Sequence, residues 1–91
     1  ASGIVRARQM LKKKEIDVLV FTSSSTVINL VEALGKDRNL INNALVACIG
    51  PVTKATALKT GLKADIVASV HTVPGLAGAI EQYFRKEAQD E

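Results

Sequence analysis

Three short, largely apolar runs most constrain the fold of this 91-residue chain. They are Val18–Phe21, Ala44–Ile49 and Asp65–Val70. Strands without polar alternation are typical of parallel sheets that helices cover on both faces. Each run leads through a polar or glycine-containing turn into a segment with apolar residues at helical spacing. The sequence therefore predicts three consecutive βα units, which favour a parallel sheet with right-handed crossovers.

One helix is predicted before the first strand and one after each strand. Gly35 stands where a C-terminal cap is expected, and Pro51 suits a first helical position. Residues 36–43 are predicted as a polar stretch and a turn, and residues 87–91 are expected to fray. The expected helices are Ile4–Lys14, the segment carrying Val27 to Leu34, Val52–Thr60, and the segment that opens at Pro74 and carries Leu76, Ala77, Ile80 and Phe84.

The chain is predicted to be a single α/β domain over residues 1–91, with an incomplete fold. Aromatic residues make up only 3% of it, so the core must be mainly aliphatic, with Phe21 and Phe84 as its largest members. A helix comes first with no strand before it, and three strands make a thin sheet for a doubly wound fold. We expect either further chain or another copy to complete the layer.

Charge and cysteine content favour a cytoplasmic protein that binds neither nucleic acid nor membrane. The net charge is +3, and the one basic run, Lys12 to Lys14, closes a predicted helix. No aromatic side chains lie nearby to stack on bases, so a solvated helix end is favoured over a nucleic-acid patch. Cys48 lies inside an apolar run and is predicted to be a buried thiol. No apolar stretch is long enough to span a bilayer, and no signal-peptide pattern is present.

Three turns follow the predicted strands, where open parallel sheets bind their ligands. They are Thr22–Thr26, Gly50–Thr53 and Ser69–Gly75, and each delivers the chain into a helix N-terminus. Free backbone N–H groups and the positive end of the helix dipole suit phosphate or carboxylate. Serine and threonine at helix starts are also ordinary N-caps. The turns therefore predict an anion site, with simple capping as the alternative at each one.

Side chains with obvious catalytic roles are missing from this edge of the sheet. Asp17 and Asp65 precede their strands and so lie at the opposite edge. His71 is interpreted as a loop residue, since it lacks the Cys or carboxylate partners of a metal site. Tyr83 is interpreted as a packing residue. No glycine-rich dinucleotide or phosphate-loop motif occurs, so we predict no catalytic residue, metal or cofactor.

The same three turns carry a resemblance to a known family. IDVLVFTSSSTV at 16–27, ACIGPVT at 47–53 and TVPGL at 72–76 resemble the C-terminal part of uroporphyrinogen-III synthases. TGLK at 60–63, before the third strand, agrees with this family as well. The resemblance covers nearly the whole chain and implies one partial, flavodoxin-like lobe of a two-lobed enzyme.

The resemblance implies that hydroxymethylbilane is cyclised to uroporphyrinogen III, with inversion of the last pyrrole ring and loss of water. The family uses neither metal nor organic cofactor, and it holds its polycarboxylate substrate between two lobes through backbone amides and hydroxyls. By position in the motifs, the substrate-binding residues expected here are Thr22, Ser23, Ser24, Ser25, Val52, Thr53 and Thr72.

The expected partners are a linear or cyclic anionic tetrapyrrole and the other lobe of the same enzyme. The family's tyrosine, which assists departure of the hydroxyl group, belongs upstream of the stretch that this chain resembles. The chain alone is therefore expected to have little or no activity. One alternative is an isolated or engineered half-domain that dimerises through an open sheet edge. Another is a flavodoxin-like module that binds a nucleotide or phosphate, although its turns offer no aromatic residue to stack on a flavin.

Overall fold

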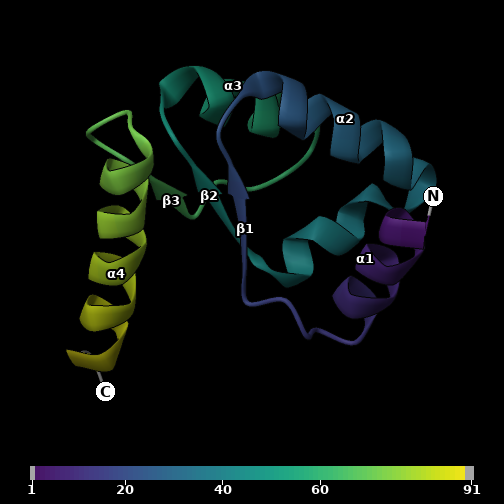
Figure 1. Ribbon diagram of the computed structural model, residues 1–91, viewed down its shortest axis with the longest axis horizontal. Helices are drawn as coiled ribbons and strands as arrows, with labels where there is room; N and C mark the ends of the chain where they lie inside the picture. The colour runs from purple at the N-terminus through teal and green to yellow at the C-terminus, as the bar shows by residue number, and fades with distance from the viewer. Residues whose placement is uncertain (1, 90–91) are drawn as a thin grey trace.

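The computed structural model describes residues 2–89 and confirms a parallel α/β fold (Figure 1). The strands lie in the order β1-β2-β3, and both neighbouring pairs are parallel. The sequence of elements is α1 (Ser2–Lys12), β1 (Val18–Phe21), α2 (Ser24–Leu34), the 3-10 helix η1 (Gly35–Asn43), β2 (Leu45–Cys48), α3 (Pro51–Lys59), β3 (Ile66–Val67) and α4 (Val73–Gln89).

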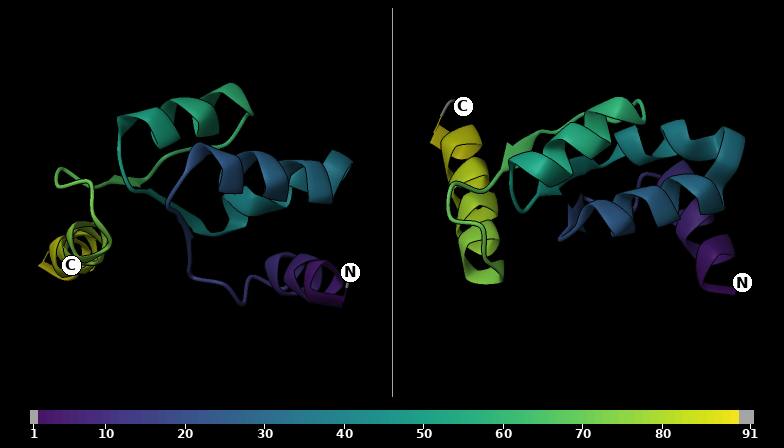
Figure 2. Two further views of the ribbon diagram at one scale, coloured as in Figure 1. Left: turned by 45° about the horizontal axis from the view of Figure 1, so that its top comes forward. Right: turned by 90° about the horizontal axis from the view of Figure 1, so that it is seen from above.

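Helices cover both faces of the sheet, but unequally. Side chains from α1, α2, η1 and α3 pack with Phe21, Val46 and Cys48 into the larger core, on one face. On the other face, Ala47 and Ile66 pack mainly against α4. Figure 2 shows α2 and α3 side by side, with α4 apart from them. The fully or nearly buried members of the larger core are Leu11, Phe21, Val27, Val31, Leu34, Ile41, Ala44, Val46, Cys48, Ala57 and Leu62.

Asp65 completes the sheet at the start of β3. Its Oδ2 atom accepts a hydrogen bond from the backbone N–H of Val46 at 2.8 Å, and Lys63 Nζ lies 3.1 Å from the same oxygen. A carboxylate thus occupies the place of a backbone acceptor in the ladder. The hydrogen-bonded part of β3 is only Ile66–Val67, shorter than the predicted run.

Residues 35–43 differ from the predicted polar stretch and turn, because they form the 3-10 helix η1. Ile41 from this helix is fully buried in the larger core. Gly35 has the positive φ expected of a helix-ending glycine, and its N–H bonds to the carbonyl of Val31. The predicted end of α2 is therefore confirmed, whereas its continuation into η1 was missed.

Two expectations about the last helix are wrong. Phe84 was expected in the core but keeps 45% of its surface exposed. α4 also continues through Gln89 instead of fraying from residue 87, while residues 90–91 lie outside the described part of the chain. None of the helices within residues 2–89 combines the length and apolar character needed to cross a bilayer.

Candidate functional site

The three predicted turns lie together at one edge of the sheet. Because β1, β2 and β3 are parallel, their carboxyl ends meet at this edge. β1 passes through Thr22 and Ser23 into α2, and β2 passes through Ile49 and Gly50 into α3. The chain after β3 turns into α4 at Thr72. We call this group of turns and helix starts the ligand edge.

Ser23, expected as a substrate-binding residue, is the N-cap of α2, which was the alternative interpretation of this turn. Its backbone is extended, and its Oγ accepts a hydrogen bond from the N–H of Thr26 at 3.2 Å. The Thr26 hydroxyl in turn donates to the Ser23 carbonyl at 2.7 Å. The Ser23 hydroxyl oxygen is thus engaged by the first turn of its own helix, which is the geometry of an N-cap. Thr22 and Ser25 flank the cap, and both are exposed.

Ser24 ties the start of α2 to α3. The Thr56 hydroxyl lies 2.8 Å from Ser24 Oγ, and Ser24 Oγ lies 3.5 Å from the carbonyl of Val52. Thr56 also approaches the Val52 carbonyl, at 3.3 Å. These hydroxyl contacts hold the N-terminal parts of the two helices side by side. The positive ends of the two helix dipoles therefore lie close together at the ligand edge.

The N-terminus of α3 has no side-chain cap. Its N-cap residue is Gly50, which has no side chain to accept a hydrogen bond, and Pro51 follows at the first helical position. The N–H groups of Val52 and Thr53 belong to the first turn, where no helical carbonyl precedes them. The Val52 side chain is 73% exposed, whereas Thr53 is only 4% exposed. The Thr53 hydroxyl, predicted to bind substrate, is therefore buried, and the accessible polar groups of this turn belong to the backbone.

The turn into α4 is compact and lies against the turn into α3. Thr72 Oγ1 accepts from the Gly75 N–H at 3.0 Å, which makes Thr72 the N-cap of α4. The His71 ring lies over Gly50, since a Cβ at Gly50 would come within 3.2 Å of it. A shallow, mostly apolar cavity of about 230 Å³ opens here, lined by Ile49, Gly50, Pro51, Val52, Thr53 and His71.

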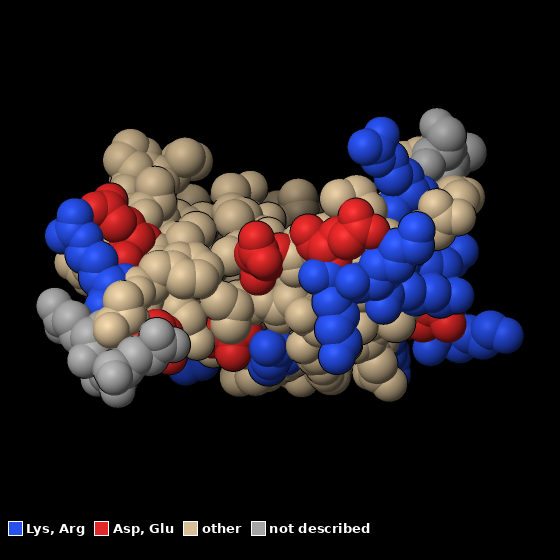
Figure 3. Space-filling model, turned by 90° about the horizontal axis from the view of Figure 1, so that it is seen from below, with Lys and Arg blue, Asp and Glu red and all other residues tan. Residues whose placement is uncertain are grey.

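Few basic side chains lie at the ligand edge. Lys54 is the only Lys or Arg in the three turns and the first helical turns that follow them. The basic run Lys12 to Lys14 lies at the other end of the molecule, because α1 ends shortly before β1 begins. Figure 3 views that end and shows Lys and Arg gathered on the α1 side. An anion at the ligand edge would therefore rely on N–H groups, hydroxyls and helix dipoles.

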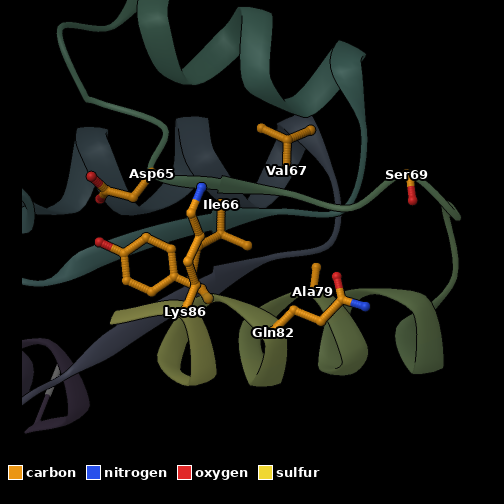
Figure 4. Close-up of a pocket in the computed structure, with 8 residues that line it drawn as sticks. Asp65, Ile66, Val67, Ser69, Ala79, Gln82 and Lys86 are labelled. Carbon is orange, nitrogen blue, oxygen red and sulfur yellow. The ribbon is translucent and has the colours of Figure 1, made fainter. Parts of the chain in front are cut away.

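A second cavity, of about 270 Å³, lies between β3 and α4 (Figure 4). Lys86 and Gln82 extend from α4 toward the strand, and Asp65 lies at one end. The Asp65 carboxylate is already engaged by Val46 and Lys63. The cavity is open and lies away from the helix N-termini, so it is a weaker candidate than the ligand edge.

Titratable groups near the sheet do not form a reactive centre. Cys48 is fully buried, and burial, with a smaller contribution from the charge of Asp65, raises the pKa of its thiol. A raised pKa disfavours the thiolate, so the side chain is a packing residue, as predicted. Within residues 2–89, no three His, Cys, Asp or Glu side chains come together in a way that could hold a metal ion.

Sequence reasoning missed Thr56, which holds the two helix N-termini together. The sequence did indicate one of its contacts, because Thr56 lies four residues after Val52 and so on the same face of α3. A hydroxyl on that face has a backbone carbonyl within reach in the preceding turn. Its second partner, Ser24, is 32 residues away in the sequence, and only the fold brings the two together.

Comparisons with known proteins relate most of this chain to one family. The family model described as uroporphyrinogen-III synthase HemD matches residues 3–78. The uroporphyrinogen-III synthase of Chlorobaculum parvum is 36% identical over 80 residues, which cover 88% of this chain and 32% of that protein. The uroporphyrinogen-III synthase of Synechococcus elongatus is 30% identical over 81 residues, which cover 84% of this chain and 31% of that protein.

The chain thus spans about a third of the length of these curated relatives, and no solved structure matches it. The matched family region contains all three turns of the ligand edge. The chain belongs to the uroporphyrinogen-III synthase family.

Proposed function

We propose that this chain supplies one wall of the tetrapyrrole-binding cleft of a uroporphyrinogen-III synthase. The reaction would cyclise hydroxymethylbilane to uroporphyrinogen III, with inversion of the last ring and loss of water. Family membership supports the assignment. The observation that carries it is the pairing of the α2 and α3 N-termini through Ser24 and Thr56.

Each element of this wall has a simple role toward a carboxylate. The N–H groups of Val52 and Thr53 would donate to it from the uncapped start of α3. The Ser24 hydroxyl would be oriented by its bond to Thr56. The cavity beneath His71 offers an apolar wall for a pyrrole ring. Thr22 and Ser25 are exposed beside these groups and would bind further carboxylates.

Such an edge would act by positioning the substrate. Ring closure of a flexible tetrapyrrole is already intramolecular, so holding its two ends together would lower the conformational entropy that the step must lose. Enclosure needs an opposing surface, which the relatives have the length to provide, since this chain matches only 32% and 31% of them. We therefore propose that this chain is one part of a two-lobed enzyme, with little or no turnover alone. A cytoplasmic location stays a prediction.

The test is a backbone-amide NMR titration with uroporphyrinogen III or its oxidised porphyrin. We expect the amides of Ser24, Val52, Thr53 and Thr72 to shift together and saturably. Amides around Asp65, at the opposite edge, serve as the internal control and should stay in place. A well-dispersed spectrum in which none of the ligand-edge amides moves would count against the proposal, as would equal shifts at both edges.

A further inference from the structure

His71 is the one histidine of the chain, and it lines the apolar cavity at the start of α3. A Cβ placed at Gly50 would come within 3.2 Å of the Cγ and Cδ2 atoms of His71 and 3.5 Å of its Nδ1 atom. Gly50, the N-cap of α3, therefore leaves a space that the imidazole ring fills. His71 is nevertheless exposed, so a ligand at the start of α3 would meet its ring.

Two hydrogen bonds hold the backbone on either side of His71. The Thr72 N–H donates to the Val70 carbonyl at 2.9 Å, so His71 is the central residue of a three-residue turn. The Thr72 hydroxyl then accepts from the Gly75 N–H and caps α4. His71 thus lies one residue before the N-cap of α4 and against the N-cap of α3. The positive ends of both helix dipoles are directed toward this place.

The strands and turns around His71 contain no formally charged side chain. Residues 18–31, 44–53 and 66–80, which include the three strands and the turns that follow them, have no Asp, Glu, Lys or Arg. The titratable side chains in these ranges are His71 and Cys48. Cys48 is fully buried, and burial raises the pKa of its thiol, so it stays neutral.

The helices that pack against this turn add positive charge close by and negative charge only farther away. α3 carries Lys54 in its first turn and Lys59 in its last turn. In α4 the first charged residue is Glu81, more than two turns after the helix begins. None of the first turns of α2, α3 and α4 contains an acidic residue. A proton on His71 therefore has no carboxylate partner in these turns.

We propose that His71 is a proton-linked binding residue of the ligand edge, which is protonated when a carboxylate of the ligand binds at the start of α3. The proposal deepens the tetrapyrrole site and rests on it. Without a ligand, the charge of an imidazolium at His71 is opposed by Lys54 and by the two helix dipoles. A bound carboxylate provides the missing negative charge.

The sign of the pH dependence follows from this arrangement. A ligand that favours the protonated imidazole is in turn bound more tightly by it, because coupling between two binding events is reciprocal. Binding therefore takes up a proton, and the affinity rises as the pH falls. The rise should occur between about pH 8 and pH 5, where histidine side chains change their charge.

A purely structural role for His71 predicts a different result. If the ring served only to fill the space over Gly50, replacing it would lower stability or weaken binding equally at every pH. A change in the pH profile of binding is what separates the two roles.

The experiment measures the affinity for the oxidised porphyrin of uroporphyrinogen III at about pH 6 and about pH 8. We expect the wild type to bind at least about fivefold more tightly at the lower pH, which is the lower end of usual coupling between sites. His71→Gln, whose amide does not titrate, should lose most of this ratio. Lys54→Gln, the matched control, should weaken binding at both pH values and keep the ratio. Titration of the porphyrin itself affects all three proteins alike.

The imidazole signals of His71 give a second measurement that needs no variant. Because the chain has one histidine, its ring protons are identified directly in the NMR spectrum. With saturating porphyrin, these signals should keep the chemical shifts of the protonated form to a higher pH than without it.

Two results would overturn the role of His71 and leave the proposed cleft intact. One is a wild-type affinity ratio that His71→Gln retains, and the other is ring signals that titrate alike with and without porphyrin. Absence of saturable binding at both pH values would instead contradict the proposed function, and the role of His71 with it. Circular dichroism of His71→Gln checks that a changed ratio is not loss of fold.

Discussion

Thr56 Oγ1 lies 2.8 Å from Ser24 Oγ, and this bond joins two helices that belong to successive βα units. Both side chains are partly buried, so the bond is shielded from competing water. It fixes the spacing of the α2 and α3 N-termini, which the proposed anion site requires. The ligand edge is thus held by side chains as well as by the sheet.

Replacing Thr56 with valine should loosen this link without changing the side-chain volume much. A typical intramolecular hydrogen bond contributes about 1 kcal/mol, so we expect Thr56→Val to lower the free energy of unfolding by about that amount. Urea unfolding followed by circular dichroism measures the change. In a double-mutant cycle with Ser24→Ala, the two effects should be less than additive. Strict additivity would show that the bond contributes nothing.

A negative charge at Val52 should raise the stability of the protein slightly but weaken the binding of porphyrin. Val52→Glu places a carboxylate in the first turn of α3, where the helix dipole stabilises it by about 0.5 kcal/mol. The same charge should weaken porphyrin binding, since like charges about 4 Å apart repel by about 1 kcal/mol in water and more near a protein surface. Leu58→Glu, in the last turn of the same helix, is the matched control and should leave binding unchanged.

Thermal unfolding and porphyrin titration of both variants measure the two effects. A Val52→Glu protein that binds porphyrin as tightly as the wild type would place the ligand elsewhere. Equal weakening by Leu58→Glu would indicate a general effect of net charge.

The sequence predicted those parts of the fold whose cause is local. Uninterrupted apolar runs identified β1 and β2, and the capping that was given as the alternative at each turn is found at Ser23 and Thr72. Helical spacing placed Phe84 on an apolar face, but spacing does not tell whether another element covers that face. β3 is shorter than the predicted run Asp65–Val70, and at its first position the Asp65 side chain takes a ladder position, which no local pattern encodes.

Cys48 should make the free energy of unfolding fall as the pH becomes alkaline. Burial raises the pKa of its thiol above the ordinary value of 9.0, so the unfolded chain ionises first as pH rises. The contribution to stability is therefore full below pH 9.0 and is lost as pH rises toward the folded-state pKa. Urea midpoints at about pH 7.5 and about pH 10 should differ more for the wild type than for Cys48→Ala. Equal differences would contradict this assignment.

Alanine at Gly75 and alanine at Gly78, both in α4, should change the free energy of unfolding in opposite directions. A Cβ at Gly75 would lie 2.2 Å from the carbonyl oxygen of Val70, a contact with backbone that cannot move aside cheaply. We expect Gly75→Ala to lower the free energy of unfolding by about 1–3 kcal/mol, as overpacking typically does. A Cβ at Gly78 would meet nothing within 4 Å, and alanine is favoured over glycine inside a helix by about 0.5–1 kcal/mol. Gly78→Ala should therefore stabilise the protein.

Urea unfolding of the two variants, compared with the wild type, tests this difference. The slope of the unfolding free energy against urea should stay the same in all three, so that the midpoints report stability alone. In the NMR spectrum, Gly75→Ala should also shift the amides from Val70 to Thr72, because the turn must open to accept the methyl group. If Gly75→Ala were as stable as Gly78→Ala, the close approach of Gly75 to Val70 could not be what shapes the turn into α4.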